Sequence, residues 1–269
     1  MTGTMRRPRQ PLALAYHGVA AVPLVDDPHC LFTNPRALRR QIRSLRRWGY
    51  ELVTFGALAG RAALGSAAGL AALTFDDGLA DNLHTLLPLL QAESAPATVF
   101  AVSGWLGGVH PDAPGHRLMD AADLRLLRDA GIEIGAHTCT HPDLTRLAHE
   151  EAVRELRDSR MALEQVLGEP VRIAAYPYGA ADSHTERACG EAGFDAACRV
   201  EGTGSWEERY ALPRQSMGNA STMAGLRLKR AGRFEQAVRR RPWGPARMRR
   251  RRALETVQRR LRTGGRSRS

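Results

Sequence analysis

Short runs of apolar residues alternate along this chain with longer segments in which apolar residues recur every three or four positions. The runs predict buried strands over residues 12–16, 51–55, 70–75, 97–102, 132–136, 171–176 and 194–200. The segments between them predict helices, the clearest over residues 35–48, 120–130, 146–167 and 183–192. Strands and helices that alternate in this way indicate an α/β fold with a parallel sheet or barrel.

Polar residues that can carry out chemistry follow several of the predicted strands directly. In chain order these residues are His17, the pair Asp76-Asp77, the pair His137 and His141, and Tyr178. The carboxyl ends of parallel strands meet on one edge, which is where α/β folds place their active sites. The sequence therefore predicts that these groups converge on one rim.

Asp76 and Asp77 end the apolar run Leu70–Phe75 and precede Gly78. Side chains alternate along a strand, so two adjacent acids can point at different targets, one a metal and the other a water. Taken on its own, the pair is better explained by an ordinary strand end followed by an Asp-Gly turn. The residues on the rest of the rim decide between these interpretations.

His137 and His141 have the spacing of one helical turn, but they follow a strand and precede Pro142. This context favours a structured loop over an amphipathic helix. Two imidazoles with one carboxylate make an open, three-ligand site for a transition metal. Cys139, between the two histidines, is interpreted as a packing residue, and His110 and His116 as solvated loop residues.

A cation with an open coordination position lowers the pKa of bound water and polarises a carbonyl. A second carboxylate can accept the proton from that water, and a histidine can protonate the leaving group. The residue inventory therefore fits metal-assisted hydrolysis of an amide or ester. The chain has no GxSxG motif and no Cys/His pattern that indicates a covalent nucleophile.

Three motifs in this chain resemble the first three motifs of polysaccharide deacetylases, the carbohydrate esterases with a NodB-like domain. They are Thr74–Gly78 (TFDDG), His137–His141 (HTCTH) and Tyr176–Gly179 (YPYG), and the resemblance covers about residues 10–220. It implies a distorted (β/α) barrel of the NodB-homology type. It also implies a divalent metal, usually zinc, that hydrolyses the acetamide of N-acetylated sugars.

Carried over residue by residue, the resemblance implies that Asp77, His137 and His141 are the metal ligands and that Asp76 is the general base. Tyr178 would line the substrate groove and offer its backbone N–H to the oxyanion.

The chain departs from the family pattern at three points. Ala175 stands where the third motif usually has an arginine that pairs with the base, and Arg214 is the candidate replacement, with Arg172 the weaker one. The Leu-x-His motif near the C-terminus is absent, but Ala15-Tyr16-His17 is similar to the motif of permuted members such as poly-N-acetylglucosamine deacetylases, so His17 is assigned as general acid. The aromatic fourth motif is not evident, and Trp206 is poorly placed for it.

The net charge of +11 is concentrated at the C-terminal end of the chain. Residues 227–269 contain 17 Lys or Arg and 2 Asp or Glu, which leaves 22 basic and 26 acidic residues in 1–226. This basic tail favours peripheral contact with an anionic membrane over contact with nucleic acid, and a solvated tail without a partner is the alternative. Residues 1–10 are predicted as a flexible N-terminus, 11–226 as the deacetylase domain and 227–269 as a tail that is helical or disordered.

The four cysteines show no CxxC spacing, so reduced thiols are predicted, with a Cys189–Cys198 pair as the alternative. No apolar signal-peptide core precedes His17, and no segment has the length of a membrane span, which predicts a cytoplasmic protein.

The predicted function is removal of the N-acetyl group from a sugar in a polysaccharide, glycolipid or related glycoconjugate. The alternatives are a hydrolase of a non-sugar amide or imide, and an inactive carbohydrate- or membrane-binding module.

Overall fold

The computed structural model describes residues 9–200 and 205–233. The chain divides into two compact units, Met1–Ser221 and Thr222–Ser269. In the second unit the described part contains the helix α7 (Met223–Arg230). The predicted flexible N-terminus and most of the predicted basic tail lie outside the described residues.

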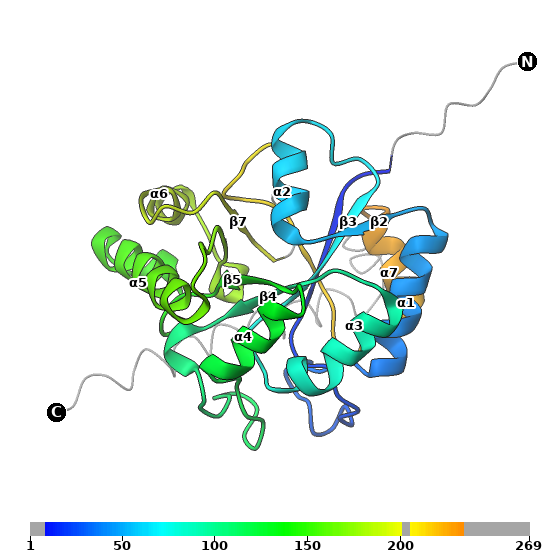
Figure 1. Ribbon diagram of the computed structural model, residues 1–269. Helices are drawn as coiled ribbons and strands as arrows, with labels where there is room; N and C mark the ends of the chain where they lie inside the picture. Colours follow the sequence, from blue (N-terminus) through cyan, green and yellow to red (C-terminus); the bar gives the residue numbers. More distant parts are fainter. Residues whose placement is uncertain (1–8, 201–204, 234–269) are drawn as a thin grey trace, which may run out of the picture. The chain divides into compact units, whose positions relative to one another are not determined.

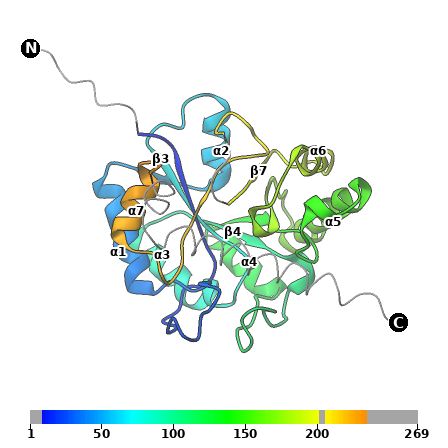
Figure 2. The ribbon, with the colours of Figure 1, turned by 180° about the vertical axis from the view of Figure 1, so that it is seen from behind.

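The first unit contains a parallel sheet with helices around it (Figures 1 and 2). The strands are β1 (Leu12–Tyr16), β2 (Glu51–Val53), β3 (Leu70–Phe75), β4 (Thr98–Ala101), β5 (Glu133–Ala136), β6 (Ile173–Ala175), β7 (Ala196–Cys198) and β8 (Gln215–Ser216). The strand order is β7-β6-β5-β4-β3-β1-β8, and β2 pairs with the first half of β3. All of these strand pairs are parallel, as the alternating pattern predicts.

The helices of this unit are α1 (Pro35–Arg47), α2 (Phe55–Ala63), α3 (Leu87–Glu93), α4 (Ala121–Asp129), α5 (His149–Leu167) and α6 (Ser183–Glu191). Several of these helices begin where a side chain caps the first backbone N–H groups. Asn34 caps α1 ahead of Pro35, and Asp120 and Asp123 form a capping box at α4. The helix predicted over 146–167 begins later, at His149, because the short 3-10 turn η3 (Leu144–Arg146) precedes it.

The sheet curls into a distorted barrel, which a stretch of chain after β7 helps to close. In that stretch the Ala197 N–H donates to the Arg209 carbonyl at 2.8 Å, and the Leu212 N–H donates to the Ala197 carbonyl at 3.1 Å. The same stretch continues into β8, which pairs with β1 at Leu14 and Ala15. Residues 209–216 therefore connect the two ends of the sheet, between β7 and β1.

Small side chains inside the barrel leave room for a few aromatic ones. Ala13, Ala72 and Ala175 are buried in one cluster with Phe100, and Phe55 of α2 packs in the same cluster. Gly135 in β5 is required by close packing, because a Cβ there would lie 2.5 Å from the Phe100 ring. The interior is a packed core, so the chemistry is confined to the rim.

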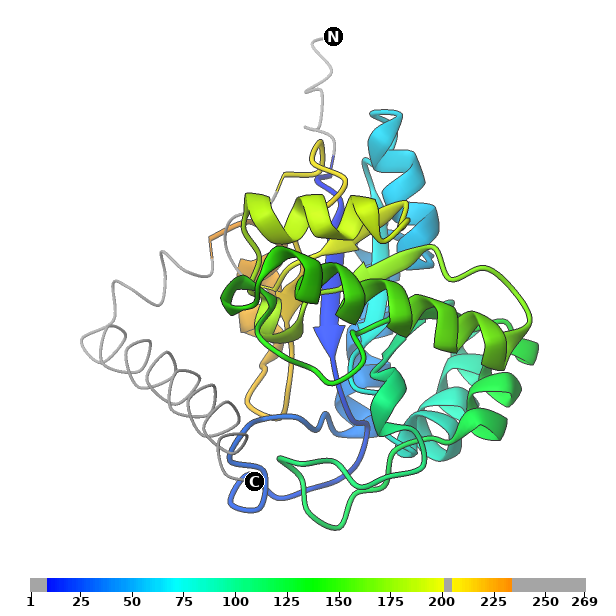
Figure 3. The same ribbon diagram turned by 90° about the vertical axis from the view of Figure 1, so that its left-hand side faces the viewer.

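The carboxyl ends of the strands face the loops 17–34 and 103–120 (Figure 3). These two loops, with the turns that follow β3, β5 and β6, surround the rim at which the sequence predicts the active site. No helix within the described residues is long and apolar enough to cross a membrane.

Candidate active site

The two adjacent acids of the TFDDG motif leave β3 in different directions. The Asp76 N–H donates to the Tyr16 carbonyl at 2.8 Å, so Asp76 continues the pairing of β3 with β1. The backbone of Asp77 is left-handed, with φ of 71°, and Gly78 follows with φ of 74°. This turn separates the two carboxylates, as required if they have different functions.

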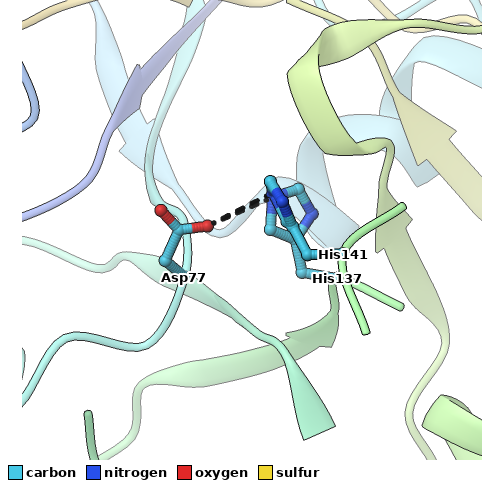
Figure 4. A group of neighbouring side chains, drawn as sticks. All are labelled: Asp77, His137 and His141. Carbon is cyan, nitrogen blue, oxygen red and sulfur yellow. Dashed lines mark ion pairs between the residues drawn. The ribbon is translucent and has the colours of Figure 1, made fainter. Parts of the chain in front are cut away.

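Asp77 faces the two histidines of the HTCTH motif (Figure 4). Its Oδ1 lies 3.5 Å from Nε2 of His137 and 3.5 Å from Nε2 of His141. One ligand atom from each of the three residues lies within 4.8 Å of the others, and all three side chains are buried. The structure thus brings together the three residues that the sequence predicts as metal ligands.

The orientation of the donors in this triad fits a transition-metal ion. Asp77 Oδ1 is buried and has no hydrogen-bond partner among the described residues, which is costly unless a cation binds there. His137 Nδ1 lies 2.7 Å from the Ala175 carbonyl, so Nδ1 donates to that carbonyl and the lone pair of Nε2 faces Asp77. Two imidazoles and a carboxylate suit zinc and related divalent metals.

Two members of the triad, His141 and Asp77, are held in the protonation state that a metal requires. Burial lowers the pKa of His141 to about 3, against the opposing effect of the Asp77 charge, so the imidazole is neutral near pH 7. Burial alone would raise the pKa of Asp77, but the His110 hydrogen bond and the nearby histidines hold that pKa well below its usual range. A neutral imidazole and an ionised carboxylate are therefore available without loss of a proton.

The two histidines of the HTCTH motif lie on a loop, as Pro142 suggests, and not on a helix. Thr138 and His141 have φ of 67° and 59°, and the Thr138 hydroxyl accepts from the His141 N–H at 3.0 Å. Glu155 of α5 accepts hydrogen bonds from the N–H groups of Cys139 and Thr140, each at 2.9 Å. Glu155 therefore fixes the segment that joins the two histidines.

We expect that Glu155→Ala will weaken zinc binding about tenfold, because the HTCTH loop loses the acceptors that fix its shape. The free energy of unfolding of the metal-free protein should fall by only about 1 kcal/mol, since these bonds are partly exposed to solvent. Competition with a chromophoric chelator and urea unfolding measure the two effects. Asp158→Ala, one turn further along α5 and exposed, is the matched control and should change neither.

Asp76 forms a buried, two-pronged ion pair with Arg214. Arg214 Nη1 lies 2.7 Å from Asp76 Oδ1, and Nη2 lies 2.9 Å from Oδ2. Arg214 is fully buried, donates also to the Thr74 hydroxyl, and stacks 5.1 Å from the Phe100 ring centroid. The weaker candidate, Arg172, lies at the surface beside Asp195. Arg214 thus occupies the position relative to Asp76 that Ala175 cannot fill.

This ion pair controls the charge on Asp76. Burial alone would raise the pKa of Asp76, but the Arg214 guanidinium and the nearby histidines together lower it below its usual range. Asp76 therefore stays ionised at neutral pH, and its carboxylate can accept a proton.

His17 reaches the same rim from the end of β1. Its Nε2 lies 3.9 Å from Asp77 Oδ2, and its side chain is 26% exposed. The Asn82 side-chain amide donates to the His17 carbonyl at 3.1 Å, and Asp81 accepts from the Val19 N–H at 2.5 Å. The end of β1 is thereby fixed, with the His17 imidazole partly exposed to solvent.

Comparison with known proteins agrees with this geometry. The family model for polysaccharide deacetylases matches residues 65–197. Residues 65–197 of this chain belong to the polysaccharide deacetylase family. The matched region contains both the TFDDG and the HTCTH motifs, so the family resemblance inferred from the motifs is confirmed.

Two relatives each match about half of this chain. Bacillus subtilis (strain 168) YxkH is 27% identical over 144 residues, which cover 53% of this chain and 49% of YxkH. A chitin deacetylase of Colletotrichum lindemuthianum is 30% identical over 131 residues, which cover 47% of this chain and 48% of that protein. The chain thus spans about half the length of these two relatives.

A solved structure has the same fold over most of the chain. The deacetylase PplD of Streptococcus pyogenes, solved in complex with acetate, superposes with a TM-score of 0.70 at 20% identity. The match covers 81% of this chain and 97% of PplD. The distorted parallel barrel predicted from the sequence is therefore confirmed.

Two side chains at the rim of the barrel were not predicted to take part in the site. His110, interpreted from the sequence as solvated, is only 2% exposed, and its Nε2 lies 2.9 Å from Asp77 Oδ2. Trp105 packs with its ring centroid 5.0 Å from that of His141. Trp206, by contrast, packs against the hydrophobic cluster inside the barrel. The sequence holds one signal that could have placed His110 and Trp105 at the rim, namely that their loop directly follows the strand β4.

The remaining predicted residues are placed as follows. The ring of Tyr178 lies 4.8 Å, centroid to centroid, from the ring of His141, and the backbone of Tyr178 is left-handed with φ of 60°.

All four cysteines are free, so the alternative of a Cys189–Cys198 disulfide is wrong. Burial raises the pKa of both thiols to about 12, which keeps them protonated and unreactive.

Proposed function

We propose that this chain is a metal-dependent N-deacetylase that hydrolyses the acetamide of an N-acetylated sugar in a polysaccharide or related glycoconjugate. The observation that carries the proposal is the separation of the two acids in the TFDDG motif. Asp76 is paired with a buried arginine, whereas Asp77 faces two imidazoles. One acid is thus suited to proton transfer and the other to metal binding.

Asp77, His137 and His141 would hold the metal, and zinc suits their donor set. When bound, such an ion lowers the pKa of water and polarises the acetyl carbonyl. Three protein ligands leave coordination positions free for substrate and water. The carboxylate of Asp77 would neutralise part of the charge of the bound ion. The Ala175 carbonyl fixes the ring of His137.

Asp76 is proposed as the general base. Both of its oxygens are held by Arg214, so the carboxylate has one orientation and remains charged in a buried site. A carboxylate held in this way can take a proton from the attacking water without first being deprotonated. Arg214 is assigned as the residue that positions this base and stabilises its charge.

His17 is proposed as the general acid that protonates the departing amine. Its Nε2 lies next to Asp77 and its side chain is partly exposed, so a substrate that enters from solvent can reach it. The proton given to the amine converts a poor leaving group into a neutral one. Tyr178 packs against His141, and its backbone N–H would donate to the oxyanion that develops on the acetyl carbonyl.

The substrate class rests on similarity to a named relative. The Colletotrichum protein is a chitin deacetylase, and chitin is a polymer of N-acetylated sugars. Trp105 and Tyr178, both half-buried beside His141, offer flat apolar surfaces of the kind that sugar rings stack on. An inactive binding module had its only support in Ala175, and Arg214 removes that support because it pairs with Asp76.

We expect the purified protein to release acetate from N-acetylglucosamine oligomers and to lose this activity when a chelator removes the metal. Activity should return on addition of zinc or another divalent metal, because the triad itself is unchanged. A panel of polymeric, lipid-linked and nucleotide-linked N-acetyl sugars, assayed for acetate, measures the preference. Ring opening of cyclic amides without acetate release would instead support the amide or imide hydrolase.

A further inference from the structure

His110 lies inside the site although it belongs to a long loop between β4 and α4. A short antiparallel bridge between Val109 and Arg117 shapes this loop, and the His110 N–H donates to the His116 carbonyl at 2.9 Å. The imidazole is 2% exposed, and its edge faces the ring of Trp105 at a centroid distance of 5.6 Å. The position of the ring is therefore fixed by backbone and side-chain contacts together.

The hydrogen bonds of His110 determine which ring nitrogen carries the proton. The Asp112 backbone N–H donates to Nδ1 at 3.1 Å, and a backbone amide can only donate, so Nδ1 is the acceptor. Nε2 then carries the hydrogen and donates it to Asp77 Oδ2 at 2.9 Å. A protonated nitrogen has no lone pair for a metal, so His110 is not a fourth ligand.

This bond divides the two oxygens of Asp77 between two functions. Oδ2 is occupied by His110, whereas Oδ1 is buried, has no hydrogen-bond partner among the described residues and faces both ligand histidines. We propose that His110 is a positioning residue that fixes Asp77 as a one-oxygen metal ligand. By holding Oδ2 away from the ion, it keeps the coordination positions free that substrate and water require.

The proposal rests on the proposed function in one respect, namely that Asp77, His137 and His141 bind a metal. The hydrogen bond to the non-coordinating oxygen of a ligand carboxylate restricts its orientation, and loss of such a bond costs about 10–100-fold in metal affinity. Without His110, Oδ2 is free to rotate toward the ion, so the coordination number should rise and the geometry should change.

The test compares His110→Phe, which keeps the ring volume without the N–H, with His110→Gln, whose amide N–H can reach the position of Nε2. Zinc affinity is measured by chelator competition on the metal-free proteins, and the visible absorption of bound Co²⁺ reports coordination number, because its intensity falls as ligands are added. We expect His110→Phe to weaken zinc binding about 10–100-fold and to dim the Co²⁺ spectrum. We expect His110→Gln to restore most of both.

His116→Gln is the matched control, because His116 lies in the same loop and its ring packs against Phe32, away from Asp77. It should bind zinc as the unchanged protein does. The proposal is wrong if His110→Phe keeps the original affinity and Co²⁺ spectrum, or if His110→Gln is as weak as His110→Phe. If the unchanged protein itself binds no zinc, both this proposal and the proposed function fail; only the proposal on His110 fails if the unchanged protein binds zinc and both variants match it.

Discussion

Asp76→Asn is expected to bind zinc with unchanged stoichiometry and to deacetylate about 10²–10⁴-fold more slowly than the unchanged protein. An amide cannot accept the proton from the attacking water, whereas Asp77, His137 and His141 keep their positions. Acetate release under saturating metal measures the loss of rate, and metal analysis of the dialysed protein measures occupancy. His137→Ala should behave in the opposite way and lose the metal along with the activity.

Asp76→Glu is the companion variant, since it keeps the charge beside Arg214 but moves the carboxylate by one methylene. Displacement of a catalytic group by about 1 Å can cost about 10²-fold in rate, so Asp76→Glu should also be slow while remaining stably folded. It therefore tests the base even if Asp76→Asn is unstable because its guanidinium partner is left unpaired. Normal deacetylation by folded Asp76→Asn would contradict the assignment of Asp76 as base, and normal deacetylation by Asp76→Glu would show that its exact position is not critical.

Arg214→Met should both destabilise the protein and shift its pH dependence. Removal of one partner from a buried ion pair leaves an uncompensated charge, which costs about 3–5 kcal/mol. In the unchanged protein the pKa of Asp76 is lowered, so the pair stabilises the fold above the pKa of the unfolded chain, and this contribution is lost as pH falls through the folded pKa. Without Arg214 burial dominates, the pKa of Asp76 rises, and the acid limb of kcat/KM should move to higher pH.

The control for Arg214 is the double variant Asp76→Asn with Arg214→Met. It removes both charges, so urea unfolding should show that it recovers much of the stability lost in Arg214→Met without any recovery of activity. Arg214→Lys should rescue only in part, because an ammonium cannot make two parallel bonds to a carboxylate. An acid limb at the same pH in Arg214→Met and the unchanged protein would refute the role of Arg214 in holding the charge of Asp76.

The sequence predicted most of the barrel because its strands are local apolar runs. The observed bounds of β1 and β3 are those predicted. The strand β6 covers Ile173–Ala175, so it is shorter at both ends than the predicted strand 171–176. The strand β8 was missed, because Gln215 and Ser216 are half-buried polar residues without an apolar run. A two-residue strand of this kind is formed by tertiary pairing with β1 and leaves no pattern of its own.

The same distinction applies to the site. His137, His141 and the two acids could be found because each group follows a strand within one motif, and parallel strands bring their ends together. His110 could not, because its burial depends on Asp77, which lies 33 positions earlier, and its own loop is rich in glycine and proline. Arg214 was a candidate because Ala175 stands where the family motif usually has an arginine that pairs with the base. The contact of Arg214 with Asp76, 138 positions away, is visible only in the folded barrel.

The placement of Arg214 makes the charge on Asp76 depend on the stretch of chain that closes the barrel. The family match ends at residue 197, yet the stretch that pairs with β7, supplies Arg214 and joins β1 lies after it. A recombinant fragment trimmed to the family match would therefore have an open sheet and an unpaired buried carboxylate at the same time. In the intact fold, the stretch of chain that closes the sheet also supplies the arginine that pairs with the proposed base.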